Sequence, residues 1–352
     1  MLVFFQWTSI LTSTYDKSIK KDQDQDQDQA TKNKMAFSPI KYAGMNTILR
    51  RNKALVTMSA SCSSCMVRAT LGGIAPNTSS SNNNRRPMAT WPKVRPKRIR
   101  MITFDVTGTL VSFRGTLEEH YLGAATKLGV KDVDSSQFAS AFGKAYKETS
   151  KLYPCFGGAD MTAKEWWRIC VIKSFRYAGT TMDAKTSEMV FQRIYSTFGS
   201  INAYEIFPDA LPFLKWARRN GLVCGVLSNA DERYGDSILP MLGLTHDELQ
   251  FQCFSKDLRI EKPDPRAFTA AINAGEPLLA TLEPLVPANV LHIGNDFHKD
   301  FQGARSFGMH AALIDRYEET ELANEWRRRG VPVFRDLLDV VEYLGRSDCI
   351  LG

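Results

Sequence analysis

Several polar side chains of this sequence stand at the ends of predicted strands or at the starts of predicted helices. They are Asp105, Ser228, Asn229, Lys262, Asn295, Asp296 and Asp300. The carboxyl ends of parallel strands open onto one crevice, so these side chains are expected to converge. There a carboxylate can attack phosphorus, a hydroxyl can hold phosphoryl oxygens, and an ammonium can neutralise their charge. The combination predicts phosphate chemistry, with Asp105 as the nucleophile.

Each of these residues has a simpler structural interpretation when it is taken alone. An aspartate or serine after a strand is more often a helix cap than a catalyst. A single lysine such as Lys262 is usually solvated, and Asp300 could only stabilise the dipole of a nearby helix. Their succession on consecutive strand-to-helix turns favours a common site. Two carboxylates of such a site could hold Mg²⁺, which prefers oxygen ligands.

The elements that must position these residues follow an α/β pattern. Five apolar runs read as buried strands, namely 98–104, 222–227, 251–254, 290–293 and 310–314. Helical patterns separate the later runs, which implies a parallel sheet with helices on both faces. From Leu117 to about Phe198 the apolar spacing is helical throughout, without a convincing strand. We therefore predict a Rossmann-like core (98–116 and 203–345) with an all-helical cap (117–202) inserted after the first strand.

The N-terminal residues 1–97 read as a disordered tail. They contain an alternating Asp-Gln run at 22–29, and from Met35 to Arg100 there are 12 basic and no acidic residues. A basic segment rich in Ser, Thr and Asn is typical of an organelle transit peptide, and here it favours the chloroplast. A mitochondrial address, or a plain basic arm on a cytoplasmic or nuclear protein, stays open.

Composition limits the possible partners. The net charge of +7 belongs to the tail, because residues 101–352 carry 28 basic and 33 acidic side chains. This mildly acidic body argues against a nucleic-acid-binding surface. No apolar run has the length of about 18–20 residues that a membrane span needs. The sequence predicts a small phosphorylated metabolite as the partner and says nothing about oligomeric state.

Four motifs in order resemble those of the haloacid dehalogenase-like (HAD) hydrolase superfamily. They are Phe104-Asp-Val-Thr-Gly-Thr-Leu110, Leu227-Ser-Asn229, Lys262-Pro-Asp-Pro265 and His292-Ile-Gly-Asn-Asp-Phe-His-Lys-Asp300. The likeness covers about 98–344, the helical insert resembles the type I cap of that superfamily, and the whole is most similar to its REG-2-like group.

The resemblance implies roles for the residues of these motifs. Asp105 would form a covalent aspartyl-phosphate, Ser228 and Asn229 would bind the phosphoryl group, and Lys262 would steady the charge. Mg²⁺ would contact Asp105, the backbone carbonyl of Thr107 and an acid of the fourth motif. Asp296 is the favoured acid, with Asp300 in the same acidic motif.

The sequence departs from the superfamily's pattern at two positions. Thr107 stands where phosphatases of the superfamily carry a second aspartate as general acid and base, and losing such a group typically costs about 10²–10⁴-fold in rate. Asn295 replaces the acid that commonly follows the glycine of the fourth motif.

Three functions therefore stay open. The first is a slow or specialised Mg²⁺-dependent phosphatase. A good leaving group would need little protonation, so its hydrolysis would not require the aspartate that Thr107 replaces. The second is a metal-independent haloacid dehalogenase-like hydrolase. The third is a catalytically impaired protein with a binding or regulatory role.

Overall fold

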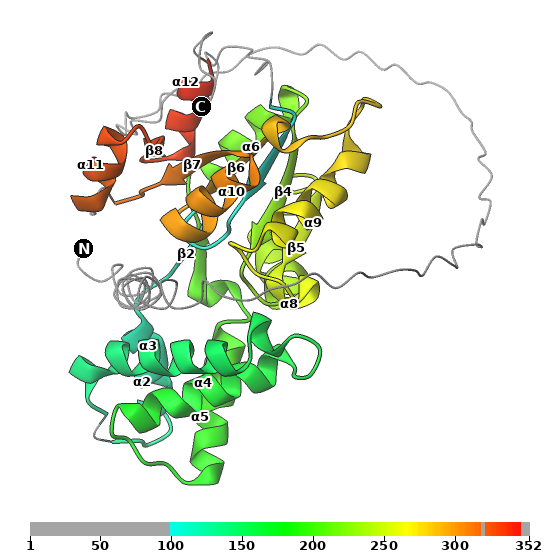
Figure 1. Ribbon diagram of the computed structural model, residues 1–352. Helices are drawn as coiled ribbons and strands as arrows, with labels where there is room; N and C mark the ends of the chain where they lie inside the picture. The colour runs from blue at the N-terminus through cyan, green and yellow to red at the C-terminus, as the bar shows by residue number, and fades with distance from the viewer. Residues whose placement is uncertain (1–98, 132, 318–320, 346–352) are drawn as a thin grey trace, which may run out of the picture. The chain divides into compact units, whose positions relative to one another are not determined.

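A computed structural model describes residues 99–345 of the chain, except 132 and 318–320. The predicted tail and transit peptide lie outside these residues. The described body contains a parallel sheet, a small antiparallel ribbon and a set of helices inserted between the two strands of that ribbon (Figure 1).

The main sheet has six parallel strands in the order β5-β4-β1-β6-β7-β8. In chain order they are β1 (Met101–Phe104), β4 (Val223–Ser228), β5 (Phe251–Phe254), β6 (Val290–Gly294), β7 (His310–Ile314) and β8 (Val333–Phe334). β1 lies at the centre and pairs with both β4 and β6. The carboxyl ends of β1, β4 and β6 therefore lie side by side, which is where the predicted site residues stand.

Alternate side chains of β1 belong to two different hydrophobic clusters. Ile102 and Phe104 pack in the cluster that includes α6 (Ala210–Arg219) and α12 (Leu337–Gly345). Met101 packs in the cluster that includes α9 (Pro265–Gly275) and α10 (Gly303–Phe307). Successive side chains of a strand point to opposite faces of its sheet, so helices cover both faces of the sheet.

The helical insert runs between the two strands of the antiparallel ribbon, β2 (Val111–Phe113) and β3 (Tyr204–Ile206). Its helices are α2 (Leu117–Thr126), α3 (Ser135–Leu152), α4 (Ala163–Tyr177) and α5 (Ala184–Thr197). Each begins at a residue whose side chain accepts hydrogen bonds from the first turn, and these caps are Thr116, Asp134, Thr162 and Asp183. In α2 and α4 a glutamate three residues on completes a capping box.

The predicted α/β class with a parallel sheet is confirmed, and the predicted strand count of five is corrected to six. The additional strand, β8, has only two residues, which is too short to show a periodicity in the sequence. The short segment after Asp105 forms β2 because it pairs with β3 about ninety residues later. The remaining helices are α7 (Leu239–Met241), α8 (Ser255–Leu258) and α11 (Glu321–Arg328).

Two helices of the core, α7 and α10, directly follow a π-helical turn. These turns are Tyr234–Ile238 before α7 and Phe297–Gln302 before α10. Such turns occur often at functional sites, and both of them contribute residues to the site described below.

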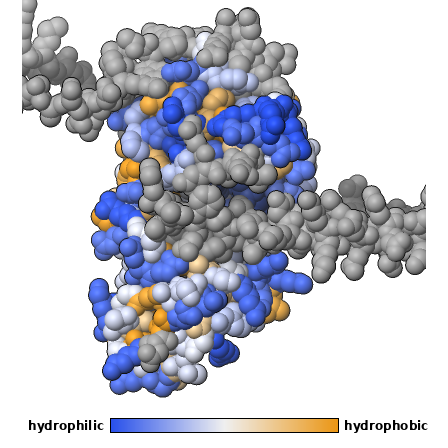
Figure 2. Space-filling model, turned by 90° about the vertical axis from the view of Figure 1, so that its left-hand side faces the viewer, coloured by the Kyte–Doolittle hydropathy of each residue, from blue (hydrophilic) through white to orange (hydrophobic). Residues whose placement is uncertain are grey.

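Hydrophilic residues cover most of the face shown in Figure 2, and hydrophobic residues appear there only in small patches. Among the described residues, none of the helices combines the length and the apolar character needed to cross a bilayer.

Candidate active site

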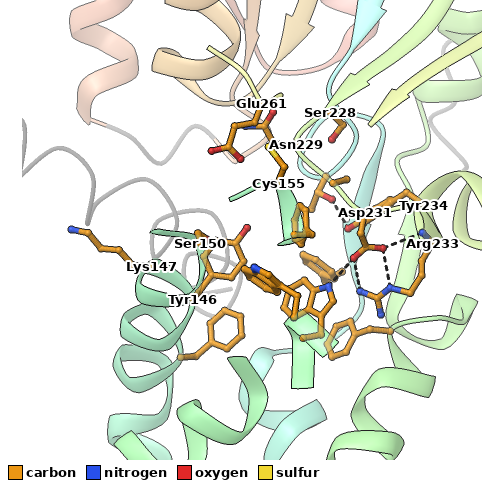
Figure 3. A pocket seen from close by; sticks show the side chains of 18 of the residues that line it. Tyr146, Lys147, Ser150, Cys155, Ser228, Asn229, Asp231, Arg233, Tyr234 and Glu261 are labelled. Atoms are coloured by element: carbon orange, nitrogen blue, oxygen red, sulfur yellow. Dashed lines mark hydrogen bonds and ion pairs between the residues drawn. The ribbon is translucent and has the colours of Figure 1, made fainter. Parts of the chain in front are cut away.

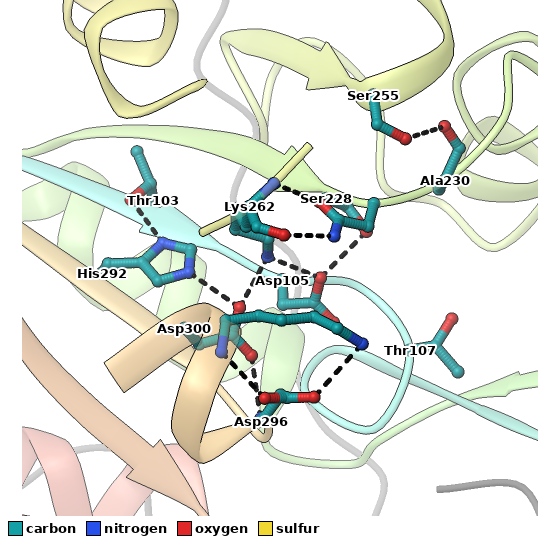
Figure 4. Close-up of polar contacts among 12 residues, drawn as sticks. Thr103, Asp105, Thr107, Ser228, Ala230, Ser255, Lys262, His292, Asp296 and Asp300 are labelled. Atoms are coloured by element: carbon teal, nitrogen blue, oxygen red, sulfur yellow. Dashed lines mark hydrogen bonds and ion pairs between the residues drawn. The ribbon is translucent and has the colours of Figure 1, made fainter. Parts of the chain in front are cut away.

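The carboxylate of Asp105 lies directly after β1 and receives two hydrogen bonds on the same oxygen. The ammonium of Lys262 and the hydroxyl of Ser228 both donate to Oδ1, each at 2.9 Å. Only 15% of the Asp105 side chain is exposed. Oδ2 has no hydrogen bond to another described residue, so this second oxygen is left for a ligand (Figure 4).

Lys262 is shared between two carboxylates. Its Nζ lies 2.6 Å from Oδ1 of Asp300, and the side chains of both residues are almost fully buried. The other oxygen of Asp300 accepts the backbone N–H of Asp296 at 2.9 Å. The lysine therefore sits between Asp105 and Asp300 and compensates both charges, as Figure 4 shows.

Asp300 receives a further hydrogen bond from a buried histidine. Nε2 of His292 lies 3.1 Å from Oδ1 of Asp300, and Nδ1 lies 2.8 Å from the hydroxyl of Thr103. A carboxylate only accepts, so Nε2 carries the proton and Nδ1 accepts from Thr103. β1 and β6 bring the two residues together, because Thr103 and His292 are register partners in the sheet.

These contacts set the charge states of the site. Burial raises the pKa of Asp105, and the ammonium of Lys262 opposes that rise. Burial would also raise the pKa of Asp300, but Lys262 and His292 hold it well below its usual range. Burial lowers the pKa of His292, and it would lower that of Lys262, but the two aspartates raise it instead. The site therefore contains a neutral imidazole and one ammonium for two carboxylates.

Asn229 holds the backbone of Lys262 with both ends of its amide. Its Nδ2 donates to the carbonyl of Lys262 and its Oδ1 accepts the N–H of Lys262, both at 2.8 Å. These bonds use the oxygen and one of the two N–H groups of the amide. Asn229 therefore fixes the position of Lys262, and its phosphoryl-binding role stays a prediction.

Thr107, two residues after Asp105, makes a hydrogen bond with a tyrosine from the β4 side of the site. Its hydroxyl lies 2.9 Å from the phenol oxygen of Tyr234. Burial raises the pKa of Tyr234 to about 12. Both groups are therefore neutral hydroxyls near pH 7, and neither replaces a carboxyl group that could exchange protons.

The polar side chains of the fourth motif, Asp296 and Asn295, make different contacts. Oδ1 of Asp296 accepts the backbone N–H groups of His298 and Lys299, and its Oδ2 lies 3.3 Å from Nζ of Lys299. The side chain of Asn295 lies against the turn after Asp105, where its Nδ2 would be only 2.4 Å from a Cβ on Gly108. Only glycine leaves room for that amide beside the nucleophile.

A cavity of about 510 Å³ opens between these residues and the inserted helices. Asp105, Thr107, Asn295 and Asp296 line its polar end, and side chains of α3, α4 and α5 line the rest (Figure 3). The predicted site residues Ser228, Asn229, Lys262 and Asp300 also line it. The structure thus brings all the predicted site residues to one cavity.

The loop after β4 ties the core to the inserted helices. Asp231 accepts the indole N–H of Trp167 at 2.7 Å and two hydrogen bonds from the guanidinium of Arg233. Arg233 in turn lies 4.3 Å from the ring centre of Tyr195 in α5. Burial would raise the pKa of Asp231, but Arg233 lowers it, so this pair stays ionised.

The donors at the polar end are compatible with Mg²⁺ if the ion keeps several waters. In the described part of the chain, no three His, Cys, Asp or Glu side chains gather into a metal cluster. Mg²⁺ nevertheless is often held by one or two carboxylates together with substrate phosphate. Asp105 and Asp296 supply hard oxygen donors of that kind.

Both acids of the fourth motif have protein partners, but they differ in access. Asp300 is almost fully buried, and Lys262, His292 and the N–H of Asp296 occupy its oxygens. Asp296 is partly exposed, and the only contact of its Oδ2 with a described residue is the one with Lys299, so it is the better placed of the two for a metal ion.

The site and the sheet together define a hydrolase with an aspartate at the end of the central strand. The family model described as haloacid dehalogenase-like hydrolase matches residues 99–308. The chain belongs to this family, and the family resemblance inferred from the four motifs is confirmed.

Curated relatives agree with this family. The chain is 32% identical over 258 residues to haloacid dehalogenase-like hydrolase domain-containing protein 3 of Bos taurus, covering 72% of this chain and 98% of the relative. The protein of that name from Homo sapiens is 31% identical, covering 72% and 96%. Rhythmically expressed gene 2 protein of Drosophila melanogaster is 27% identical, covering 68% and 90%.

Solved structures support the fold. A dehalogenase with an intermediate complex has a TM-score of 0.53 at 18% identity, covering 71% of this chain and 99% of that one. The HAD-hydrolase YfnB from Bacillus subtilis, bound to magnesium, has a TM-score of 0.50 at 13% identity, covering 70% and 99%. At these identities the likeness concerns the fold alone.

Sequence reasoning did not assign roles to His292, Thr103 or Tyr234. A histidine inside the apolar run of β6 was the available signal, because a buried polar side chain needs a partner. Tyr234 gave no such signal, since it reaches Thr107 only through the tertiary fold.

Proposed function

We propose that the protein hydrolyses the phosphate monoester of a small organic molecule through a covalent aspartyl-phosphate on Asp105. The observation that carries this proposal is the pair of hydrogen bonds from Lys262 and Ser228 to one oxygen of that carboxylate. They orient the nucleophile at the polar end of a cavity large enough for a small metabolite.

The reaction has two steps. A carboxylate oxygen of Asp105 attacks the phosphorus, and the ester bond breaks with its electron pair going to the departing oxygen. Water then attacks the phosphorus of the acyl phosphate, which releases inorganic phosphate and restores the carboxylate. Lys262 compensates negative charge in both steps. The hydroxyl of Ser228, which donates to Asp105 in the structure, would turn to a phosphoryl oxygen when the substrate binds.

Mg²⁺ belongs to this proposal, with Asp105, the backbone carbonyl of Thr107 and Asp296 as its ligands. When bound, it neutralises charge on the phosphoryl oxygens. A charge argument supports the need for an added cation. Asp105, Asp296, Asp300 and a phosphate dianion would face two ammonium groups, those of Lys262 and Lys299, because His292 is neutral.

A metal-independent dehalogenase is the second candidate. One observation favours it, namely that Lys262 neutralises Asp300 and that His292 donates a further hydrogen bond to it, while Asn295 replaces the acid expected after Gly294. In this case Asp105 would displace halide from the carbon of a 2-haloacid, and water would hydrolyse the resulting ester.

The deciding experiment measures product release from phosphate esters and 2-haloacids, each with Mg²⁺ and with chelator. The wild type is compared with Asp105→Asn and with Asp247→Asn, an exposed aspartate away from the site. Mg²⁺-dependent phosphate release that only Asp105→Asn abolishes supports the first function. Halide release in chelator supports the second. Failure to turn over any substrate would contradict both and favour a binding or regulatory role.

The location of the protein is a separate proposal. We propose that residues 35–97 direct the chain to the chloroplast. A fluorescent fusion with and without these residues tests this, and unchanged distribution of the shortened fusion would contradict it.

A further inference from the structure

The wall of the cavity opposite the nucleophile consists mainly of aromatic rings. Among those of the inserted helices and the loop between α3 and α4, Tyr146, Trp167 and Tyr195 are partly exposed, whereas Phe142, Phe156, Trp166 and Phe191 are buried. The ring centres of Phe156 and Trp166 lie 4.9 Å apart, as do those of Trp166 and Trp167. These rings form one contiguous aromatic cluster, and Tyr146 and Trp167 give it an accessible aromatic surface.

Hydrogen bonds hold the two indoles of this cluster in place. Nε1 of Trp166 donates to the carbonyl of Tyr153 at 2.8 Å, and Nε1 of Trp167 donates to Asp231 at 2.7 Å. The neighbouring ring of Tyr195 is held beneath the guanidinium of Arg233. The surface is therefore preorganised, which reduces the entropy lost when a flat group binds against it.

The buried polar side chains along the cavity already have protein partners. Asp231 accepts two hydrogen bonds from the guanidinium of Arg233 (Figure 3). Asn229 binds the backbone of Lys262, and Tyr234 binds Thr107. A substrate rich in hydroxyl groups would lose its hydrogen bonds to water here and gain few in return, which is costly. An apolar or aromatic group makes no such hydrogen bonds to water, so it does not lose them when it enters the cavity.

The remaining charged residues of the cavity wall beyond its polar end do not change this conclusion. Lys147, Lys151 and Glu261 also line the cavity, but all three are exposed to solvent. Figure 3 shows the ammonium of Lys147 pointing away from the aromatic side chains. Exposed groups of this kind add little binding energy for a neutral sugar or polyol.

The chemistry at Thr107 points to the same class of substrate. The departing oxygen of an alkyl ester must be protonated as it leaves, and the side chains that meet at position 107 are two hydroxyls, those of Thr107 and Tyr234, instead of a carboxyl group. A phenolate is a far weaker base than an alkoxide, so it departs without a general acid. The aromatic wall and the residues beside Asp105 are separate observations, and both favour an aryl ester, whose leaving group is a phenolate.

We propose that the substrate is an aryl phosphate, a monoester whose aromatic ring packs against the partly exposed rings of Tyr146 and Trp167, whose ring centres lie 6.1 Å apart. This assignment rests on the proposed phosphatase function and names its substrate class. In an aryl phosphate the aromatic ring carries the leaving oxygen. The same group can therefore pack against the aromatic surface and leave without a general acid at position 107.

The test compares kcat/KM for four esters with the wild-type protein in Mg²⁺. Phenyl and 2-naphthyl phosphates have leaving groups of similar acidity but different ring area, and we expect about fivefold to tenfold preference for naphthyl. Cyclohexyl phosphate matches phenyl in size but needs protonation, and we expect at least about 100-fold lower kcat. Glucose 6-phosphate should be the poorest of the four. Equal or better hydrolysis of glucose 6-phosphate would overturn the assignment.

A variant pair separates the aromatic surface from general effects on the inserted helices. Tyr146→Ala should remove the preference for naphthyl over phenyl. The control, Tyr177→Ala, changes a partly exposed tyrosine of α4 that does not line the cavity, and it should keep that preference. Loss of the preference in both variants, or in neither, would count against a contact between the ring and Tyr146.

A binding measurement distinguishes failure of this assignment from failure of the proposed function. Calorimetry compares 2-naphthylphosphonate with 3-hydroxypropylphosphonate, neither of which is hydrolysed. Tighter binding of the naphthyl compound without turnover of any ester would refute the phosphatase and keep the aromatic site. Equal binding of both compounds would refute the aromatic site whatever the activity.

Discussion

The hydroxyl of Thr107 lies 2.9 Å from the phenol oxygen of Tyr234, at the position where a second carboxylate would serve a phosphatase best. Both residues line the cavity beside Asp105. Two neutral hydroxyls can orient each other and a substrate, but they do not supply a proton near pH 7. This contact therefore ties the choice of substrate to the residue at position 107.

Thr107→Asp should raise phosphatase activity. The new carboxyl group would stand within reach of the leaving oxygen and act as general acid, so kcat for alkyl esters should increase by about 10- to 100-fold. Aryl esters should gain much less, because their leaving group needs no proton. Steady-state kinetics on cyclohexyl and phenyl phosphates measures both effects. Thr107→Val is the control, and unchanged activity of Thr107→Asp on both esters would refute this account of Thr107.

His292 should make folding stability depend on pH. Burial lowers its pKa in the folded protein, whereas the unfolded imidazole titrates near about 6.5. As the pH falls below that value, the unfolded state takes up the proton first, so stability decreases until the pH passes the folded pKa. The loss amounts to about 1.4 kcal/mol per pH unit at most.

Urea unfolding at pH 7.5 and 5.5 tests this dependence. His292→Gln should lose less stability than the wild type between the two values. His246→Gln, which changes an exposed histidine, should behave like the wild type. Identical losses in all three proteins would show that His292 does not carry the effect.

Lys256→Met should loosen the loop that presents Phe156 to the cavity. The ammonium of Lys256 donates to the carbonyls of Phe156, Gly158 and Met161, and so fastens α8 of the core to the loop before α4. Removing it leaves three carbonyls without this donor. We expect KM for aryl phosphates to rise by about tenfold with little change in kcat, since hydrogen bonds to a charged donor contribute about 1.5–3 kcal/mol.

The control for Lys256 is Lys185→Met, because Lys185 is an exposed lysine in the first turn of α5. It should leave KM unchanged. A fall in kcat at unchanged KM in Lys256→Met would instead place this lysine in the chemistry and contradict the positioning role.

Asp296 and Asp300 should respond differently to substitution. Asp296→Asn should raise the Mg²⁺ concentration for half-maximal activity by about tenfold, because it weakens a proposed ligand. Asp300→Asn should lower kcat and stability at nearly the same Mg²⁺ requirement, because it removes a buried partner of Lys262. Activity titrated with Mg²⁺ separates the two effects, and a larger shift for Asp300→Asn would reverse the assignment.

Much of the fold and site could be predicted from the sequence because both follow local rules. Apolar runs followed by Asp105, Ser228 and Asp296 mark strands that end in polar residues. Parallel connectivity brings such ends together without any knowledge of side-chain contacts. The helical insert was visible for the same reason, since its apolar spacing repeats over many turns.

Short or long-range features escaped this reasoning. β8 has two residues, and β2 acquires its conformation only by pairing with β3. The divided tasks of the fourth-motif acids were also invisible, because Asp296 and Asp300 differ only in which donors surround them. The sequence spacing shows two acids four residues apart, but it does not show which of them is buried against Lys262 and His292.

The sequence by itself determined the family, the parallel α/β class and the set of residues that meet at the carboxyl ends of the strands. Only the tertiary structure decided that Lys262 bridges Asp105 and Asp300, that His292 holds Asp300, and that Tyr234 reaches Thr107 across 127 positions. The physical reason is that strand ends are placed by connectivity, which a sequence pattern records. Hydrogen-bond partners and charge states depend on burial and on distances between segments far apart in the chain, which no local pattern contains.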